Sequence, residues 1–460
     1  MNLIEKLIEP KNNIEESRKL FTNKDLQRLI VPLIFEQLLV MLVGVAATIM
    51  VSHAGEAAVS GVSLVDMING LFIYIFSALA TGGAVVVSQY IGKREEKNIH
   101  ASASQLVMIT TVLSVILMII VLIFHKPMLH LLFGKVEKEV MDASTTYLVI
   151  TVFSLPFLAL YNSCAALFRS MSLSRITLYI SLIMNLINVV GNAIGVFILD
   201  AGVSGVAYPT LISRIFAAIM LYVLLQNKKY QVTIHIRDIF SWQSDYIKKI
   251  LKIAVPNGIE NGLFQLSKIL LISIIAVFGT SQIAANGIAN SIDYVGAIIT
   301  LALGLAIVTV VGQCVGAGDL EQADYYIKKL IRITFYGSFI LDLVIIAFMP
   351  LILKLFSLTS ETGRYVFILV VLHNLFIIVL QPYSGPLSNA LRAAGDVKYT
   401  MIVAIIATVI CRVVFSFILG VWLNWGIIGV WIAMGIDWGI RSVLYYRRYR
   451  SGRWQKFKIV

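Results

Sequence analysis

Long apolar runs are the dominant feature of this sequence. They recur as about a dozen blocks, each long enough to cross roughly 30 Å of hydrocarbon as one helix. Because lipid offers backbone amides no hydrogen-bond partner, such blocks fold as helices, and the period-two alternation of a transmembrane barrel is absent. Charged residues make up only 13% of the 460 residues, about half the share of a soluble domain. We predict an all-α polytopic membrane protein.

Twelve transmembrane helices are expected from the apolar blocks. Residues 1–29 alternate charged and apolar side chains, which is typical of an amphipathic cytoplasmic helix and not of a signal peptide. A polar, basic linker covers 226–250, and a basic cytoplasmic tail covers 447–460. The expected spans are 30–52, 62–90, 102–124, 145–168, 176–199, 203–225, 251–277, 283–311, 327–349, 365–390, 399–420 and 426–446.

Lys and Arg are concentrated in the loops on one side of these spans. That side carries both termini, the segment KREEK at 93–97, and the tail RRYRSGRWQKFK. By the positive-inside rule, both termini are cytoplasmic. The net charge of +12 is therefore a topology signal, and no nucleic-acid partner is needed to explain it.

The two halves of the chain are repeats of one design. The segments VPLIFEQ and VPNGIEN align at the offset of 224 that separates Pro32 from Pro256. Six spans per half predict two six-helix lobes, 30–225 and 251–446, with the same orientation and a pseudo-twofold axis along the membrane normal. This plan predicts a cleft between the lobes and alternating access. At the same offset, Gly202 matches Gly426 and Gly205 matches Gly429. Arg169 matches Arg392 at an offset of 223.

Acidic and amide side chains within the spans are the candidate cation-coupling residues. A charge inside the bilayer is unfavourable, so such a residue usually faces a cavity or a partner. Glu36 and Glu260 each follow a VP pair by the same spacing, and Na⁺ is possible at either. The alternative is that each is a structural acid beside a proline, but the recurrence in both halves favours a cation site. The other candidates are Asp66, Asn185, Asn188 and Asp293, and the asparagines, with Asn192 on the same helix face, can equally join helices by hydrogen bonds.

Basic, aromatic and amide residues supply a candidate substrate cleft. Its members are Lys268, Arg412, Tyr294 and Gln381, in a setting suited to amphipathic organic cations. Lys268 and Arg412 have no acid near them in the sequence, so we expect them to meet Glu260 or Asp293 across helices. Asp437 and Arg441 are spaced i, i+4 and are expected to pair with each other. His373, in the tenth span, is expected to be structural.

Signals of catalysis and of cofactor binding are missing from the sequence. No HExxH helix, no GxxxxGK[ST] loop and no GxSxG elbow occurs. Cys164, Cys314 and Cys411 show no CxxC spacing, which predicts neither disulfides nor a thiolate metal site. We predict no enzyme and no cofactor, so that energy must come from an ion gradient or a separate partner.

Several motifs resemble those of the multidrug and toxic compound extrusion (MATE) family. Besides the two VP segments, they are SQYIGKREE, GQCVGAGDLEQA, NALRAAGDVKYT and GVWIAMGIDWGIRS. The last is similar to the closing helix of the bacterial branch related to sodium-driven members. The resemblance covers nearly the whole chain and implies cation-coupled export of cationic drugs and toxins through a central cleft.

The resemblance also implies roles for individual residues. Glu36 matches the first-span acid of the family's amino-terminal cation site, Asn185 matches its fifth-span Asn, and Glu260 matches the seventh-span Glu of the carboxy-terminal site. Two departures occur. The family's fifth-span Asp falls near Asn188 or Val189, and its tenth-span Asp falls near Gln381 in a span without acids. A proton is therefore at least as plausible as Na⁺, although Asp293 could replace the missing acid.

The predicted function is a monomeric antiporter of a bacterial cytoplasmic membrane, coupled to H⁺ or Na⁺ and exporting amphipathic, cationic drugs or toxins. The nearest alternative is a flippase for a lipid-linked precursor, which shares the two-lobed plan. A flippase that handles pyrophosphate needs several basic residues in its cleft. The basic residues within the spans that are considered for this role are Lys268, Arg214, Arg412 and Arg441.

Overall fold

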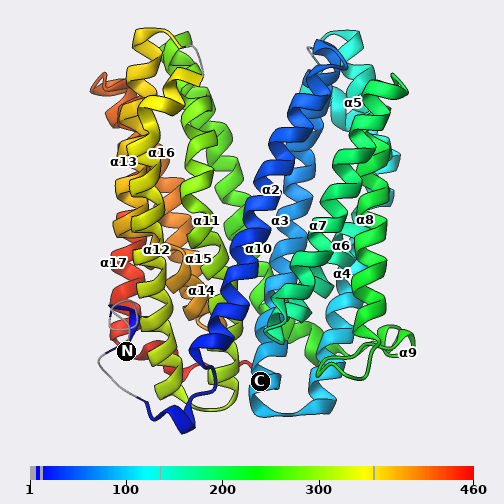
Figure 1. The fold of residues 1–460 in the computed structure, drawn as a ribbon, viewed down its shortest axis with the longest axis vertical. Coiled ribbons are helices and arrows are strands. Elements are labelled where there is room, and N and C mark those ends of the chain that lie inside the picture. The colour runs from blue at the N-terminus through cyan, green and yellow to red at the C-terminus, as the bar shows by residue number, and fades with distance from the viewer. Residues whose placement is uncertain (1–6, 11–13, 135, 356–357) are drawn as a thin grey trace. The chain divides into compact units, whose positions relative to one another are not determined.

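The chain folds into long helices that are suited to a bilayer. A computed structural model describes residues 7–10, 14–134, 136–355 and 358–460, and no β-strand occurs among them. In these described ranges, eleven helices are long and apolar enough to cross a membrane, or twelve when the pair α5 and α6 counts as one bent span. Figure 1 shows these helices as tall ribbons. The predicted all-α polytopic fold is confirmed.

Two compact units divide the chain at matching points of the repeat. One unit, called the N-unit here, is Val31–Val255, and the other, called the C-unit, comprises Met1–Ile30 and Pro256–Val460. The boundaries fall inside helices α2 (Asn23–Ser52) and α10 (Ser244–Ile275), next to Pro32 and Pro256. Proline removes one backbone hydrogen bond and kinks a helix. Each VP motif thus marks the point at which a helix leaves one unit and enters the other, and its proline favours a bend there.

The N-unit consists of six spans and a short polar connection. Its apolar core includes Val65, Phe72, Phe76 and Leu148. The short helix α9 (Ile236–Ile239) belongs to the connection before α10, and Figure 1 shows it at the end of the unit opposite to α5. The remaining helices are α3 (Glu56–Lys93), α4 (Glu96–Phe133), α5 (Lys138–Val152), α6 (Leu155–Ser170), α7 (Ser174–Ala193) with the π-helical turn η2 (Ile194–Ile198), and α8 (Ser204–Leu225).

The expected span 145–168 is a bent pair of helices. α5 and α6 meet at an angle of 49°. Pro156 occupies the first turn of α6, where its missing N–H is tolerated, and it cannot continue α5. The hydroxyl of Ser154 donates to the carbonyl oxygen of Thr151 (2.5 Å) and so caps the C-terminal end of α5.

The C-unit repeats the six-span order with more interruptions. The tenth span breaks at Gly385, and the eleventh contains two π-helical segments, one of which ends at Arg412. Such π-segments frequently occur at functional sites. Its helices are α10, the 3₁₀ turn η3 (Ala276–Phe278), α11 (Thr280–Gly316), α12 (Leu320–Leu355), α13 (Ser360–Ser384), α14 (Pro386–Ala393), α15 (Val397–Ile405), η4 (Ile406–Arg412), α16 (Val413–Ser416), η5 (Phe417–Trp422), α17 (Gly426–Arg450) and η6 (Arg453–Lys456).

The start of the chain is attached to α12 of the C-unit. Glu9 accepts hydrogen bonds from Lys329 (2.5 Å) and from the hydroxyl of Tyr325. Although partial burial opposes it, these hydrogen bonds lower the pKa of Glu9. The side-chain amide of Gln322 donates to the backbone carbonyl of Arg18 (2.8 Å). Arg18 is the last residue of the 3₁₀ turn η1 (Glu16–Arg18). These contacts explain why the described residues before Val31 cluster with the C-unit.

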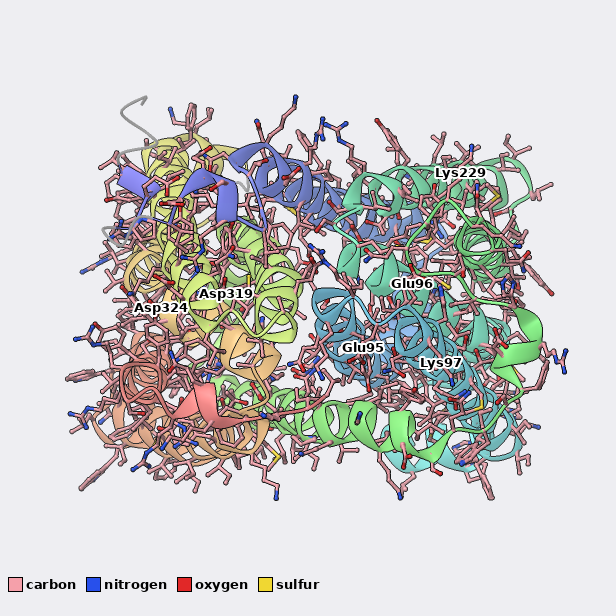
Figure 2. All side chains as sticks on the ribbon, turned by 90° about the horizontal axis from the view of Figure 1, so that it is seen from below. Glu95, Glu96, Lys97, Lys229, Asp319 and Asp324 are labelled. Carbon is pink, nitrogen blue, oxygen red and sulfur yellow. The ribbon has the colours of Figure 1, made fainter. Side chains whose placement is uncertain are left out.

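Charged residues gather where consecutive helices turn. Figure 2 looks onto the helix ends, and in the N-unit it shows Glu95, Glu96 and Lys97 at the turn between α3 and α4. Lys229 follows the end of α8 in the same unit, and Asp319 marks the turn between α11 and α12 in the C-unit. The charges of KREEK thus lie outside the apolar blocks. That this end faces the cytoplasm stays a prediction.

Candidate functional site

Each unit holds its VP glutamate in an ion pair with an arginine. Glu36 is buried and accepts from Arg169 (3.4 Å) and from the hydroxyl of Thr177 (3.0 Å). Glu260 accepts from Arg392 (2.7 Å), which also donates to Asn389 (2.6 Å). We call these pairs the two clamps. The arginines come from the ends of α6 and α14, so the clamp joins the same two spans in both units.

The clamps change how the two glutamates can act. Each carboxylate already has a cationic partner, which stabilises its charged form without a bound ion. Uptake of a coupling cation at either glutamate would have to compete with the guanidinium. The matching of Arg169 with Arg392 in the repeat is the signal that could have revealed these pairs.

Asp66 lies in a balanced polar group of the N-unit. Its side chain is exposed on α3 and accepts a long hydrogen bond from Asn69 (3.5 Å). Tyr147 and Arg214 lie close enough to interact with it electrostatically. Arg214 donates to the hydroxyl of Ser154 (2.7 Å). One acid and one base therefore share this region.

The asparagines of α7 bond to neighbours instead of converging on Glu36. The amide of Asn185 donates to Ser181 (3.4 Å) and that of Asn188 to Thr210 (3.1 Å), while Asn192 donates to Asn188 (3.1 Å). Asn188 and Thr210 join α7 to α8. Of these three contacts, that of Asn188 matches the interhelical alternative, the other two lie within α7, and a role of the asparagines in cation binding stays a prediction.

A buried acidic cluster lies in the core of the C-unit. Asp293 of α11 is 6% exposed, and its Oδ1 lies 3.0 Å from Nδ1 of His373 on α13. Asp342 of α12 is fully buried and close enough to Asp293 to interact electrostatically. Among the described residues, neither acid has an arginine or lysine as ion-pair partner. We call Asp293, Asp342, His373 and Asn374 the acidic cluster.

Gly296 provides space at the centre of this cluster. A Cβ at Gly296 would lie 2.6 Å from Oδ1 of Asp342 and 3.1 Å from Oδ1 of Asn374, so both oxygens face the same spot. Asn374 is fully buried, and no described residue hydrogen-bonds its amide or either oxygen of Asp342. Buried polar groups are normally satisfied. The oxygens of Asp342 and Asn374 are therefore open to a proton or a small cation as partner.

The acidic cluster does not have the form of a metal centre. Within the described ranges, no three His, Cys, Asp or Glu side chains are arranged to hold a metal ion. The ring of His373 is instead fixed by Trp431 and Trp438, at centroid distances of 5.5 and 5.2 Å. His373, expected to be structural, thus contacts a candidate coupling acid. Asp342 was missed, although it is the one acid inside the ninth apolar block.

A second polar centre of the C-unit is basic. A cavity of about 320 Å³ is lined by Lys268 of α10 and Arg412 at the end of η4, together with Asn286, Asn290 and Trp431. Both cations also lie over the ring of Phe264 of α10, at 4.8 and 5.6 Å from its centroid. We call this cavity the basic pocket.

The expected partners of Lys268 and Arg412 are wrong. Arg412 pairs with Asp437 (3.8 Å), and no described acid forms an ion pair with Lys268. Glu260 is unavailable because it is held by Arg392, and Asp293 lies against His373. The predicted pair of Asp437 and Arg441 is confirmed at 2.9 Å, but Arg412 shares the same carboxylate oxygen.

The two remaining cleft candidates lie apart from the basic pocket lining. Gln381, near the end of α13, accepts a hydrogen bond from the hydroxyl of Ser384 (3.3 Å). Tyr294, on α11, is exposed next to Asp293 in the sequence. Their contact with substrate stays a prediction.

Comparisons with known proteins agree with the repeat. The MatE family model matches residues 32–194 and 256–418, which cover both halves of the chain. The chain is 26% identical over 431 residues to an uncharacterized transporter, YisQ, of Bacillus subtilis, with 92% of this chain and 93% of the relative covered. It is 24% identical over 452 residues to a probable multidrug resistance protein, NorM, of Thermotoga maritima, covering 97% and 95%.

Solved structures of low sequence identity share the fold. One is described as the outward-facing conformation of a multidrug resistance MATE family transporter of the MOP superfamily, with a TM-score of 0.86, 22% identity, and 94% and 97% of the two chains covered. Another, a MOP superfamily transporter from Pyrococcus furiosus described as having a binding pocket of reverse polarity, has a TM-score of 0.85, 21% identity and the same coverage.

Proposed function

The chain belongs to the MatE family of multidrug efflux transporters, and on that basis we propose that it is a cation-coupled antiporter that exports amphipathic drugs or toxins by alternating access. Inward movement of H⁺ or Na⁺ drives outward release of the substrate. Cation and substrate need only disfavour each other's bound state for this coupling. No cofactor takes part in the proposal.

The acidic cluster is the single observation that carries the proposal. Two carboxylates that repel each other in a low-dielectric core cannot both stay charged unless a cation joins them. Asp293 and Asp342 have no described arginine or lysine to supply that charge. Uptake of a cation from one side of the membrane would therefore stabilise one state of the C-unit, which is what a coupling site must do.

The chemistry of the cluster favours a proton as the coupling ion. Asp293, Asp342 and His373 are all titratable side chains, and they do not converge as three ligands on one ion. Na⁺ prefers several oxygen ligands, and only Asp342 and Asn374 are aimed at the same spot beside Gly296. Asp66 and the asparagines of α7 stay in the proposal as an N-unit site.

The clamps are assigned a conformational role in this proposal. Glu36 and Glu260 lie beside the prolines at which α2 and α10 pass between units. A cation that displaced Arg169 or Arg392 would release the helix end that carries the arginine. The glutamates thus remain coupling candidates, though a higher barrier is expected than at the acidic cluster.

The cellular setting is also part of the proposal. We place the transporter in a bacterial cytoplasmic membrane as a monomer, with both termini in the cytoplasm. The supporting observations are the concentration of Lys and Arg in the loops of one predicted side and the bacterial origin of the two relatives described above.

A flippase for a lipid-linked precursor remains the second candidate, and the basic pocket favours it. Lys268 and Arg412 line one cavity, and Arg441 shares Asp437 with Arg412. Grouped cations suit a phosphate or pyrophosphate head group. The acidic cluster weighs against this alternative, because a flippase does not by itself require a buried site for a coupling cation.

Transport with separate ion gradients tests the proposal. Asp293→Asn in proteoliposomes should reduce proton-driven efflux of a fluorescent drug about a hundredfold, equivalent to roughly 2.8 kcal/mol of lost cation binding. Asn69→Ala, at the matching position of the N-unit, serves as control and should keep most of the activity. Drug efflux that persists in wild-type vesicles after both the proton and the sodium gradients are collapsed would reject ion coupling.

A further inference from the structure

The basic pocket has more positive than negative charge. Lys268 and Arg412 line the pocket, and the carboxylate of Asp437 pairs with both Arg412 and Arg441. The residue that acts electrostatically on Lys268 is Arg412, which is another cation. Glu260 also attracts Arg441 electrostatically, but Glu260 already forms an ion pair with Arg392. Counting this clamp therefore adds one negative and one positive charge and leaves the excess unchanged. Two positive charges remain without a counter-charge.

The position of this excess charge makes it unusual. Lys268 lies within the helix α10, in an apolar block long enough to span the bilayer, and its side chain is exposed. Facing lipid would cost about 2.5 to 3.5 kcal/mol on the insertion scale, so a lysine here is expected to face water or a ligand. The guanidinium Nε of Arg412 is buried and has no hydrogen-bond partner among the described residues. Both groups thus retain free donors.

The rest of the pocket is suited to an organic molecule. Trp431, Met434 and Ile275 supply apolar and aromatic surface, and the amides of Asn286 and Asn290 supply neutral polar contacts. Trp431 is fixed because its ring nitrogen donates to Asn286 (3.1 Å). A cavity of about 320 Å³ holds a small aromatic ligand but not a large one.

We propose that the basic pocket binds the anionic group of an amphipathic substrate, a carboxylate, phosphate or sulfonate, through Lys268 and Arg412. The aromatic part of the substrate lies against Trp431. This inference rests on the proposed function, because it names the substrate class, and it narrows the expected cationic substrate to one that carries an acidic group. A substrate amine can be present in addition, as in a zwitterion.

An equilibrium binding measurement tests the proposal without any ion gradient. Purified protein in phosphatidylcholine nanodiscs is dialysed against 2-naphthylacetate or against the matched cation 2-naphthylmethyl-trimethylammonium. The carboxylate should bind more tightly by about tenfold or more, since a charge-assisted contact contributes at that level. Equal or weaker binding of the carboxylate overturns the proposal, whereas failure of gradient-driven efflux leaves this result intact.

Variants locate the binding site. Lys268→Gln should weaken 2-naphthylacetate binding about tenfold and leave the trimethylammonium compound unaffected. Lys252→Gln, an exposed lysine elsewhere on α10, is the matched control and should change neither. Asp437→Asn removes the carboxylate that pairs with Arg412 and should tighten carboxylate binding. An unchanged affinity in Lys268→Gln, or weaker binding in a folded Asp437→Asn, contradicts the assignment.

A lipid head group and a free solute can supply the same anionic chemistry, and a further arm separates them. Phosphatidylglycerol is added to the nanodiscs in place of part of the phosphatidylcholine. Displacement of 2-naphthylacetate by this lipid identifies a head group as the natural source and supports the flippase alternative. Unchanged binding identifies a free amphipathic acid. An anion-binding pocket is supported in both cases.

Discussion

The two units share one frame but distribute their charges differently. At the offset of 224, Lys268 and Arg412 of the basic pocket correspond to Gly44 and Asn188 of the N-unit. Both pocket cations are therefore absent from the N-unit at the matching positions. The clamps, by contrast, occur in both units. The two units thus share the ion pairs that join their helices, whereas their other polar residues differ.

An acid and an amide exchange places between the units. Asp66 and Asn69 of α3 correspond to Asn290 and Asp293 of α11 at the same offset. In the N-unit the acid is exposed and lies near Arg214, whereas in the C-unit it is buried and contacts His373. A shift by one helical turn moved the carboxylate from a balanced site into the core.

The core around that carboxylate also differs. Gly296 and Asp342 of the acidic cluster correspond to Phe72, which belongs to the apolar core of the N-unit, and to Met118, which packs against that core. An aromatic ring thus fills the position where the C-unit leaves space between two oxygens. The two copies share a scaffold, and differences at a few matched positions give the C-unit separate acidic and basic centres. We infer that the C-unit carries the coupling chemistry.

Breaking a clamp should have the largest effect on stability, and the effect should be of similar size in the two units. Arg169→Gln and Arg392→Gln each leave a largely buried glutamate unpaired, which should lower the free energy of unfolding by about 3 to 5 kcal/mol. Thermal unfolding in detergent measures the loss. The double variant Glu260→Gln with Arg392→Gln should recover much of it. Equal instability of the single and double variants would show that the pair itself is not what stabilises the unit.

Gly296→Ala tests the space inside the acidic cluster. The new Cβ would lie 2.6 Å from Oδ1 of Asp342, so a shift of that carboxylate is expected, at about 1 to 3 kcal/mol of stability, with a weaker response to the proton gradient. Gly287→Ala, on the same helix with nothing within 4 Å of its Cβ position, is the control. Identical transport and melting curves for both variants would remove the argument for a site at Gly296.

Asp66→Asn should have the smallest effect. Because Asp66 is exposed and Arg214 has a second partner in Ser154, we expect a change in transport of about twofold or less and a stability change within about 0.5 kcal/mol. Efflux driven by the proton gradient in proteoliposomes measures it. A loss as large as that of Asp293→Asn would reverse the comparison and place the coupling ion in the N-unit.

The fold class and the repeat could be predicted because they depend on the length of the apolar blocks and on the spacing of motifs, both of which are read directly from the sequence. Apolar length fixes helices in a bilayer, and the paired VP motifs at one offset identify two copies of the same unit. The spacing of Asp437 and Arg441 likewise predicted their ion pair, since residues four apart are neighbours on a helix. Interactions of this kind need no knowledge of how helices are placed.

The candidate sites depended on contacts between distant segments, and sequence reasoning found them only in part. Asp293 was identified, but its contact with His373 and its proximity to Asp342 join α11, α12 and α13. Glu260 met Arg392 instead of Lys268 because α14, which continues the tenth span beyond Gly385, brings Arg392 to that carboxylate. A sequence states which charges a membrane helix carries. Only the tertiary structure decides which of them are neutralised, because electrostatic attraction depends on distances that the packing of separate helices sets.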